Sequence, residues 1–291
     1  MTRTAQWLYG WLLLLPAALL LAVFTHYPAV ATFWHSLHAT PKGSRAAAWV
    51  GLDNYGQLID DPIFWKALVN NLWFAVGTIP ASIALALAMA VWVNGRINGR
   101  GFLRLAYFTP TVLPMIAVAN IWLFFYTPEY GLLEKATAFF GAGTHNWLGS
   151  KDTALACLMV VTVWKEAGFF MIFYLAALQT MSPHLAEAAA IEGASRVYFF
   201  RRVTFPLLMP TTFFVLVNAV INAFRLVDHV VVMTRGGPDN ATSLLLYYIY
   251  EIGFRFWDSA YAGALTMVLL ALLASVALVQ FWFLERKVHY Q

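Results

Sequence analysis

The sequence predicts an all-α membrane protein with six transmembrane helices, and three observations lead to that prediction. The chain of 291 residues is 61% hydrophobic and 11% charged, whereas about 25% of the residues of a soluble domain are charged. Its apolar residues form six runs, each near the roughly 20 residues needed to cross a bilayer. Five runs contain no Asp, Glu, Lys or Arg. Polar groups could not cover so apolar a chain, so lipid is its expected solvent.

The six spans are expected at residues 7–28, 67–93, 105–127, 153–178, 205–224 and 260–284. The first could instead be a cleaved signal peptide, because Arg3 precedes it and Ala29-Val30-Ala31 resembles a cleavage site. We favour an uncleaved span, since its apolar core exceeds the usual length of about 7 to 15 residues. No linker, low-complexity tract or repeat divides the chain, so we expect one membrane domain over residues 1–291.

Prolines inside spans two and three predict kinks. Pro80 lies in span two, and Pro110 and Pro114 lie in span three. A proline removes one backbone hydrogen bond, which membrane helices tolerate when neighbours satisfy the freed carbonyl. Such kinks suit a transport path and also occur in purely structural spans.

The basic residues predict that both termini lie in the cytoplasm. With the N-terminus inside, the inside segments hold nine Lys or Arg in 50 residues, and the outside segments hold eight in 98. Cytoplasmic loops carry such an excess in membrane proteins. The net charge of +4 is therefore assigned to topology and contact with membrane lipid, and no nucleic acid partner is expected.

A short polar segment, residues 182–206, lies on the cytoplasmic side between spans four and five in this topology. Ser182 before Pro183 predicts a helix start, with the serine hydroxyl capping the first turn. Gly193 predicts its end, because glycine readily takes the left-handed conformation found there. We therefore expect a helix over residues 183–192.

A second short helix is expected after Ser195, before Pro206 opens span five. The first helix is thin, so the backbone of another protein could come close to its alanines: Ala186, Ala188, Ala189 and Ala190. Glu187 and Glu192 offer carboxylates to a basic partner. In the alternative, the segment lies on the membrane and three arginines extend to headgroups: Arg196, Arg201 and Arg202.

Polar residues within spans are candidates for a substrate path, and they equally serve as contacts between helices. Asn218 and Asn222 are four residues apart on span five and therefore share a helical face. Lys165 could attract a phosphate, although we favour a buried salt bridge to another helix. The adjacent Glu166 points about 100° away on a helix, so the two cannot simply pair.

Two further residues complete the tentative path. Trp164 could stack on a sugar ring, and Arg225 lies just past the outer end of span five. A phosphate ester would depend on Lys165 and Arg225, whereas a neutral sugar would depend on Asn218, Asn222 and Trp164.

Several chemistries are not predicted for this chain. A phosphate-binding loop needs Gly-x-x-x-x-Gly-Lys-Ser/Thr, and no lysine here follows a glycine. No Cys-x-x-Cys or pair of histidines four apart suggests a metal site, and no paired carboxylates or nucleophile with a base suggest catalysis. We therefore expect no catalytic residue, no metal and no cofactor in the chain, and the energy for transport must come from a partner or an ion gradient.

The cytoplasmic segment resembles the EAA loop of permease subunits of bacterial ATP-binding-cassette (ABC) importers. That pattern is Glu-Ala-Ala, three residues, Gly, nine residues, then Ile-x-Leu-Pro. The chain has Glu187-Ala188-Ala189, Gly193 and Val203-Thr204-Phe205-Pro206 at the same spacing. Val for Ile and Phe for Leu are conservative departures.

Other stretches are similar to the carbohydrate-uptake branch of that family. They include Trp49-Val50-Gly51-Leu52-Asp53-Asn54-Tyr55, Leu175-Ala176-Ala177-Leu178-Gln179, and Gly236-Gly237-Pro238 with Ala241-Thr242. The tail, from Val279-Gln280-Phe281 through Glu285 to Tyr290, most resembles the first permease of glycerol-3-phosphate importers.

The resemblance implies a permease in the bacterial inner membrane. Its partners would be a second homologous permease, two copies of a cytoplasmic ATPase that bind ATP and Mg, and an extracytoplasmic solute-binding protein. The helix at residues 183–192 would dock in a groove of the ATPase, with Glu187 as the best candidate for a fixing ion pair. The expected solute is a carbohydrate, a polyol or a compound like glycerol-3-phosphate. The alternative is an ion-coupled transporter or channel without an ATPase.

Overall fold

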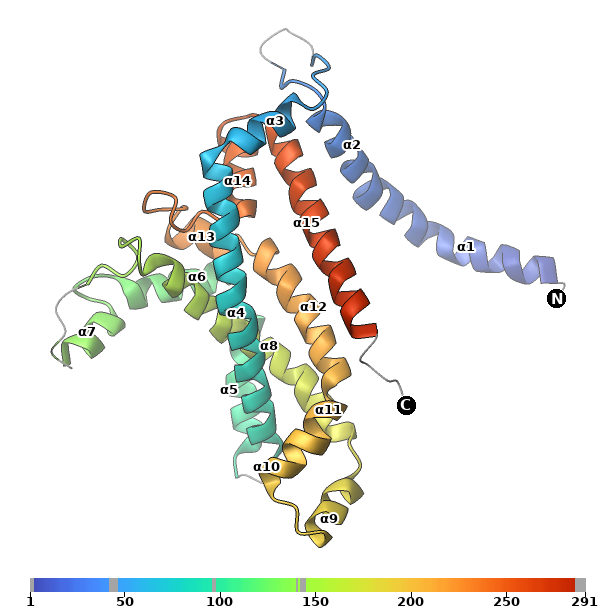
Figure 1. Ribbon diagram of the computed structural model, residues 1–291, viewed down its shortest axis with the longest axis vertical. Coiled ribbons are helices and arrows are strands. Elements are labelled where there is room, and N and C mark those ends of the chain that lie inside the picture. Colours follow the sequence, from blue (N-terminus) through green and yellow to red (C-terminus); the bar gives the residue numbers. More distant parts are fainter. Residues whose placement is uncertain (1–2, 42–46, 96–97, 140, 142–144, 286–291) are drawn as a thin grey trace. The chain divides into compact units, whose positions relative to one another are not determined.

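Helices form nearly all of the chain in the computed structural model, which describes residues 3–41, 47–95, 98–139, 141 and 145–285 (Figure 1). No β-strand occurs in these ranges. His38 and Trp49 form an isolated antiparallel β-bridge. The predicted all-α class is therefore confirmed. Two compact units are present: Met1–Asp61 with Ile249–Leu272, and Pro62–Tyr248 with Leu273–Gln291. That the chain acts as one membrane domain stays a prediction.

In the described ranges, five helical stretches are long and apolar enough to cross a membrane, and a bent pair makes a sixth if it counts as one span. Four of the predicted spans correspond to single long helices: α4 (Pro62–Asn94), α8 (Ala154–Thr180), α12 (Met209–Arg225) and α15 (Ser259–Glu285). Helices long and apolar enough to span a membrane therefore lie at these four predicted positions. Their orientation stays a prediction, and the basic tail at residues 286–291 lies outside the described ranges.

Span one runs further than the predicted end at residue 28. It comprises α1 (Arg3–Leu21), a π-helical turn η1 (Ala22–His26) and α2 (Tyr27–Ser36). Pro28 does not end the helix because it lies in the first turn of α2, where a proline is tolerated. Immediately before it, the amide of Tyr27 donates to the Ala22 carbonyl across the wider π-turn.

Span three was predicted as one kinked helix over residues 105–127, and this prediction is wrong in its geometry. α5 (Arg100–Val112) and α6 (Met115–Tyr126) meet at an angle of 103°. The reason is Pro114, which disfavours helical backbone in the residue before it. Leu113 is accordingly extended, with ψ 137°. Pro110 stays inside α5.

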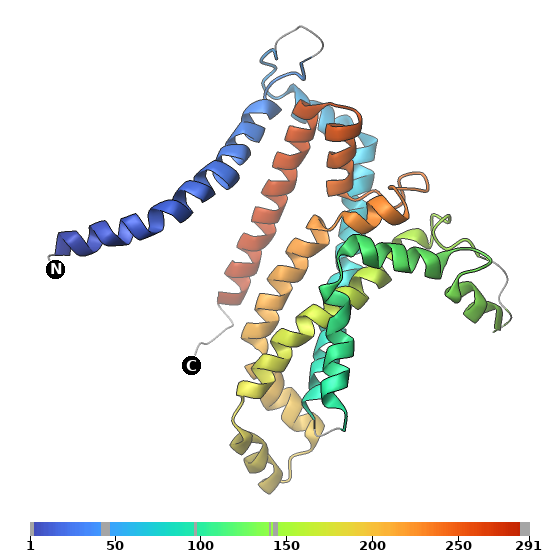
Figure 2. The same cartoon turned by 180° about the vertical axis from the view of Figure 1, so that it is seen from behind.

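The core of the second unit forms where α4 packs along α8 (Figures 1 and 2). Alanines at the contact, such as Ala86, Ala90 and Ala167, are fully buried and bring the helices close together. Gly168 brings α8 against α5, since a Cβ there would lie 2.1 Å from the carbonyl oxygen of Tyr107. Small residues of this kind are typical of helix contacts inside membranes.

Short helices complete the second unit: α7 (Leu132–Phe139), α9 (Pro183–Ile191), α10 (Arg196–Phe199), the π-helical turn η2 (Phe200–Thr204), α11 (Phe205–Leu207), α13 (Asp228–Met233) and most of α14 (Leu245–Tyr250). Within this unit α9 lies at one end of α8, and α6, α7 and α13 lie toward the other (Figure 2). The unit therefore has an α9 end and an opposite end.

In the first unit, α2 and the first part of α15 pack closely, because a Cβ on Gly263 would lie 3.2 Å from the Thr32 carbonyl oxygen. The short helix α3 (Asp53–Asp60) is held near them. The Ser36 and Tyr55 hydroxyls are 2.7 Å apart, and Tyr261 donates to Asp61 at 2.7 Å. This unit also contains the π-helical turn η3 (Glu251–Arg255).

Candidate coupling segment and polar interior

The helix α9 begins and ends close to the predicted residues. Pro183 occupies its first turn, but the Ser182 hydroxyl accepts no hydrogen bond from the α9 backbone. The predicted serine cap is therefore wrong. The carbonyl oxygen of Ser182 accepts from the amide of Leu185 instead, at 3.2 Å. Pro183 offers no N–H in this turn and already fixes its φ for a helix, which lessens the need for a side-chain cap.

Gly193 ends α9 as predicted, with φ +72°. The amide of Ala194 donates to the Ala189 carbonyl at 2.9 Å, and the amide of Gly193 donates to the Ala190 carbonyl at 3.1 Å. These two bonds form a Schellman motif, which satisfies carbonyls left free at a helix end. The EAA glycine therefore has a backbone role: it turns the chain sharply out of α9.

The second short helix was also predicted correctly. Ser195 precedes α10, and its hydroxyl oxygen accepts from the amide of Tyr198 at 3.2 Å. The chain continues through η2 into α11, where Pro206 lies in the first turn. Gly193 and Ser195 thus define the turn between two short helices, α9 and α10, and the chain continues from α10 towards α12.

The surface of α9 is almost entirely free within this chain, because none of its residues is buried. The Glu187 carboxylate, 67% exposed, lies 3.2 Å from Nδ1 of His184. Ile191 is 87% exposed although it is a large apolar residue. Glu192 is exposed at the end of the helix. The segment offers carboxylates and apolar surface that nothing in the described chain covers.

Lys165 does not form the buried salt bridge favoured from the sequence. Its ammonium donates to three carbonyl oxygens: Pro110 at 2.9 Å, Thr111 at 3.4 Å and Leu113 at 2.6 Å. These carbonyls lie at the break between α5 and α6, where the helical hydrogen bonding stops. In the part of the chain that the structure describes, no carboxylate lies within salt-bridge distance of Lys165. Lys165 therefore caps the broken helix.

Glu166 and Asn222 bind each other across the α8–α12 contact. The Asn222 amide donates to the Glu166 carboxylate at 2.7 Å. A small cavity of about 10 Å³ lies beside them and is lined by hydroxyls of α4 and α8 (Thr78, Ser82 and Thr162). A space of that size holds about one water. This cavity is therefore too small for a sugar.

The other path candidates lie apart from this interior. Asn218 is half-buried, and its amide donates to the Phe214 carbonyl of its own helix at 2.7 Å. Trp164 is 39% exposed and meets Trp122 edge to face, with ring centroids 5.6 Å apart. Arg225 is exposed at the last residue of α12. Asn218 and Asn222 thus have different environments despite their four-residue spacing.

Sequence reasoning missed Asn71. This residue is fully buried, donates to the Ala223 carbonyl at 3.1 Å and accepts from the Leu245 amide at 3.1 Å. It therefore joins α4 to α12 and α14. The available signal was the pair of asparagines, Asn70 and Asn71, in an otherwise apolar run.

Asp239 was also missed as a contact residue of the loop after α13. Its carboxylate accepts from Lys151 at 2.8 Å and lies 3.6 Å from the Lys66 ammonium. The hydrogen bond and charge of Lys151, together with Lys66, hold the pKa of Asp239 below its usual value. The two lysines tie this loop to α4 and to the segment before α8.

The chain is similar to known transport proteins over nearly its full length. Residues 79–289 match the family described as binding-protein-dependent transport system inner membrane component. The chain is 32% identical over 291 residues to the sn-glycerol-3-phosphate transport system permease protein UgpA of Yersinia pestis, covering 99% of this chain and 97% of the relative. It is 33% identical over 273 residues to the trehalose/maltose transport system permease protein MalF of Thermococcus litoralis, covering 93% and 91%.

A solved structure shares the fold. The match is a chain of a bacterial alginate ABC transporter in complex with an alginate pentasaccharide-bound periplasmic protein. The TM-score is 0.86 at 20% identity, over 99% of this chain and 98% of that chain. At this identity the likeness concerns the fold alone.

Proposed function

The chain belongs to the family of inner membrane components of binding-protein-dependent transport systems, and from this premise we propose that residues 182–206 are the docking site of an ATPase that drives import. The chain is thus a permease subunit, which sets aside the ion-coupled carrier or channel. Two ATPase copies bind ATP and Mg, a second permease completes the membrane part, and an extracytoplasmic binding protein delivers the solute.

The exposure of α9 is the observation that carries the docking proposal. A helix of nine residues with none buried gains little stability from its own chain, since most helices depend on tertiary packing. Glu187, Ala188, Ala189 and Glu192 are presented to a partner, and Ile191 supplies apolar area. Gly193 ends α9 and Pro206 lies in the first turn of α11, so these two residues shape the connection through which a displacement of α9 is transmitted to α12.

The docking proposal is tested with Glu187→Ala in the assembled importer. We expect less ATPase to co-purify with the tagged chain and solute uptake to fall about tenfold, the effect of a change of about 1.4 kcal/mol. The matched control is Asp152→Ala, which removes an exposed carboxylate two residues before α8. At 1.5 Å per residue, the 27-residue α8 places that control about 40 Å from α9. Unchanged co-purification and uptake in Glu187→Ala would contradict the docking proposal.

We propose that the solute is a carbohydrate, a polyol or a glycerol-3-phosphate-like compound. The support is the similarity over nearly the full chain to permeases named for sn-glycerol-3-phosphate and for trehalose/maltose. Thermal-shift screening of the cognate binding protein against neutral sugars, polyols and their phosphate esters tests this class. Stabilisation only by amino acids or metal ions would refute it.

We further propose that Trp164, Asn218 and Arg225 line the solute path, whereas Lys165 and Asn222 hold the helices that form it. Trp164 and Arg225 are exposed in this chain, and Asn218 is half-buried with its amide bonded to its own helix, whereas the polar groups of Lys165 and Asn222 are bonded to other helices. The test places a cysteine at position 218 in a Cys157→Ser background. Solute should slow its reaction with a thiol reagent, while a cysteine at the exposed, apolar Ile221 should react at an unchanged rate.

A further inference from the structure

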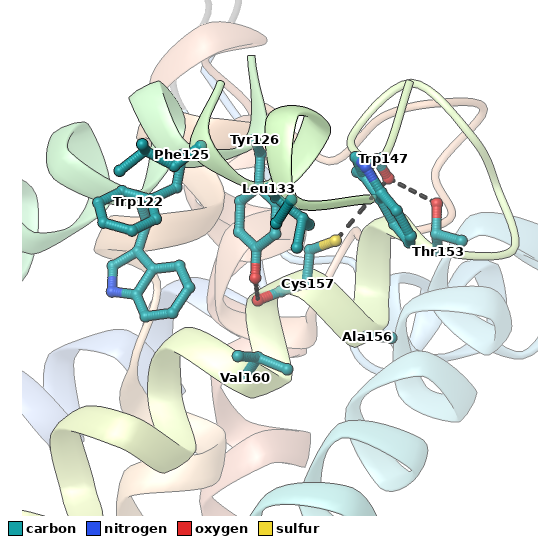
Figure 3. A pocket seen from close by; sticks show the side chains of 11 residues that line it. Trp122, Phe125, Tyr126, Leu133, Trp147, Thr153, Ala156, Cys157 and Val160 are labelled. Carbon is teal, nitrogen blue, oxygen red and sulfur yellow. Dashed lines mark hydrogen bonds between the residues drawn. The ribbon is translucent and has the colours of Figure 1, made fainter. Parts of the chain in front are cut away.

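An apolar pocket of about 550 Å³ lies in the second unit, away from the coupling segment and from the polar interior. Its walls come from α6, α7, the segment before α8 and the first two turns of α8. Figure 3 shows Trp122 and Phe125 at one end, Trp147 at the other, and Cys157 and Val160 along α8. A pocket of this size is in the range that holds small-molecule ligands.

The walls offer almost nothing to a polar ligand, because their surface is almost entirely apolar and the hydroxyls of Tyr126 and Thr153 are already bonded within the chain. The Tyr126 hydroxyl donates to the Cys157 carbonyl at 3.4 Å. The Thr153 hydroxyl donates to the Trp147 carbonyl at 2.6 Å. A sugar here would lose its hydrogen bonds to water without replacement, at a cost of about 1–3 kcal/mol for each polar group. Water is disfavoured for the same reason, since it needs about two to four polar partners.

The position of the pocket points to hydrocarbon from the bilayer. Its α8 residues, Ala156, Cys157 and Val160, belong to the first two turns of this helix, and that end of α8 is the one away from α9 (Figure 2). Tryptophan and tyrosine gather at this depth, where the acyl chains meet the headgroups. Trp122, Tyr126 and Trp147 fit that distribution.

One group beside the pocket complements a phospholipid rather than a plain alkane. Lys135 lies on α7 between the pocket residues Leu133 and Ala136, and its side chain is exposed. Among the described carboxylates, none pairs with Lys135. A phosphate at the pocket mouth would give this ammonium a counter-charge.

We propose that this pocket binds one acyl chain of an anionic phospholipid from the leaflet on the side away from α9, with the lipid phosphate near Lys135. The lipid fills the space under α6 and α7 and holds these two helices against α8. The site needs no ATPase and no transported solute, so it stands independently of the docking and path proposals.

The test uses the assembled importer in nanodiscs of phosphatidylethanolamine and phosphatidylglycerol, with a diazirine on one acyl chain of the phosphatidylglycerol. After photolysis, mass spectrometry maps the lipid adducts. We expect them to concentrate on peptides from α6, α7 and the start of α8. Ala156→Trp, which fills the pocket from α8, should lower that yield about tenfold. The matched control, Ala138→Trp on the exposed part of α7, should leave the yield unchanged.

Two additions keep the proposal falsifiable. Ala136→Trp fills the pocket from α7, and the wild-type adduct map alone tests the site if both filling variants fail to assemble. Lys135→Glu should reduce labelling by phosphatidylglycerol but not by an equivalent phosphatidylethanolamine probe. Adducts spread evenly over all exposed helices would overturn the proposal. So would a photo-cross-link from a benzophenone at position 160 to the second permease, because a protein would then occupy the pocket.

Discussion

The coupling segment and the polar interior use the same kinds of residue in opposite ways. On α9, the Glu187 carboxylate is exposed and its partner in the chain is a nearby, even more exposed histidine. In the interior, Lys165 donates to three backbone carbonyls and Glu166 accepts from Asn222. Charged hydrogen bonds in a low-dielectric surrounding are strong, and leaving one group unpaired there is costly.

The contrast separates residues that hold this fold from residues that are free for a partner. A substitution in the interior should therefore reduce stability and transport together. A substitution on α9 should reduce transport and leave stability almost unchanged. The following predictions test that division.

The largest effect is expected for Lys165→Met, which leaves the carbonyls at the α5–α6 break without a donor. We expect a loss of about 3 kcal/mol in the free energy of unfolding, measured by thermal unfolding of the protein in nanodiscs. Uptake should fall for every solute, whether charged or neutral. Lys165→Arg is the control, because its guanidinium still donates to carbonyls. A stable Lys165→Met variant that loses uptake of phosphate esters alone would assign Lys165 to the solute path instead.

Gly168→Val should rank next, since its Cβ would lie 2.1 Å from the Tyr107 carbonyl oxygen. Separating α8 from α5 should cost about 1–3 kcal/mol and lower the unfolding temperature. Gly101→Ala serves as the control, because a Cβ on that α5 glycine meets nothing within 4 Å. Equal unfolding temperatures for the two variants would contradict the close helix contact.

The two asparagines of α12 form a matched pair. Asn222→Ala leaves the Glu166 carboxylate without its donor, so stability should fall by about 1–3 kcal/mol. Asn218→Ala removes a half-buried amide whose hydrogen bond goes to a carbonyl of its own helix and not to a charged group, so stability should change by about 0.5 kcal/mol or less. If Asn218 lines the path, the second variant should still reduce uptake. Similar stability losses at both positions would remove the distinction.

Gly193→Ala should act locally. A non-glycine residue in the left-handed region costs about 1–2 kcal/mol, which would fray the end of α9 without disturbing α8. Hydrogen exchange should increase in α9 alone, and uptake should fall while the unfolding temperature holds. Gly193→Asn is the control, because asparagine tolerates this conformation. Faster exchange throughout α8 would mean that α9 is not independent of the core.

The smallest effect concerns Asp239. Its pKa is lowered by Lys151 and Lys66, so the ion pairs stabilise the loop above the unfolded-state pKa of about 3.9 and are lost as pH falls through the lower folded value. Asp239→Asn should remove this acid-side dependence, seen as a small difference in unfolding temperature between neutral and acidic pH. A wild-type protein without that difference would show that the exposed pairs contribute nothing to stability.

The sequence alone determined the class and the coupling segment. Hydrophobic runs of span length need no knowledge of packing, because lipid forces backbone hydrogen bonds to close within each helix. The end of α9 at Gly193 and the cap at Ser195 were equally predictable, since both depend on bonds between neighbours in the chain. The predicted hydroxyl cap at Ser182 was wrong, because the Leu185 amide donates to the backbone carbonyl of Ser182 and not to its side chain.

Tertiary structure decided everything that depends on which distant groups meet. Pro114 predicted a kink in span three. Only the folded structure shows that α5 and α6 meet there at 103° and that Lys165 donates to the carbonyls at the break. Likewise, the four-residue spacing of Asn218 and Asn222 predicts that they share a helical face. In the structure, however, Asn222 donates to Glu166, whereas Asn218 donates to the Phe214 carbonyl of its own helix. A polar side chain inside a membrane must find a partner, and its sequence neighbours do not specify which one. That choice is made only when α4, α5, α8 and α12 pack together.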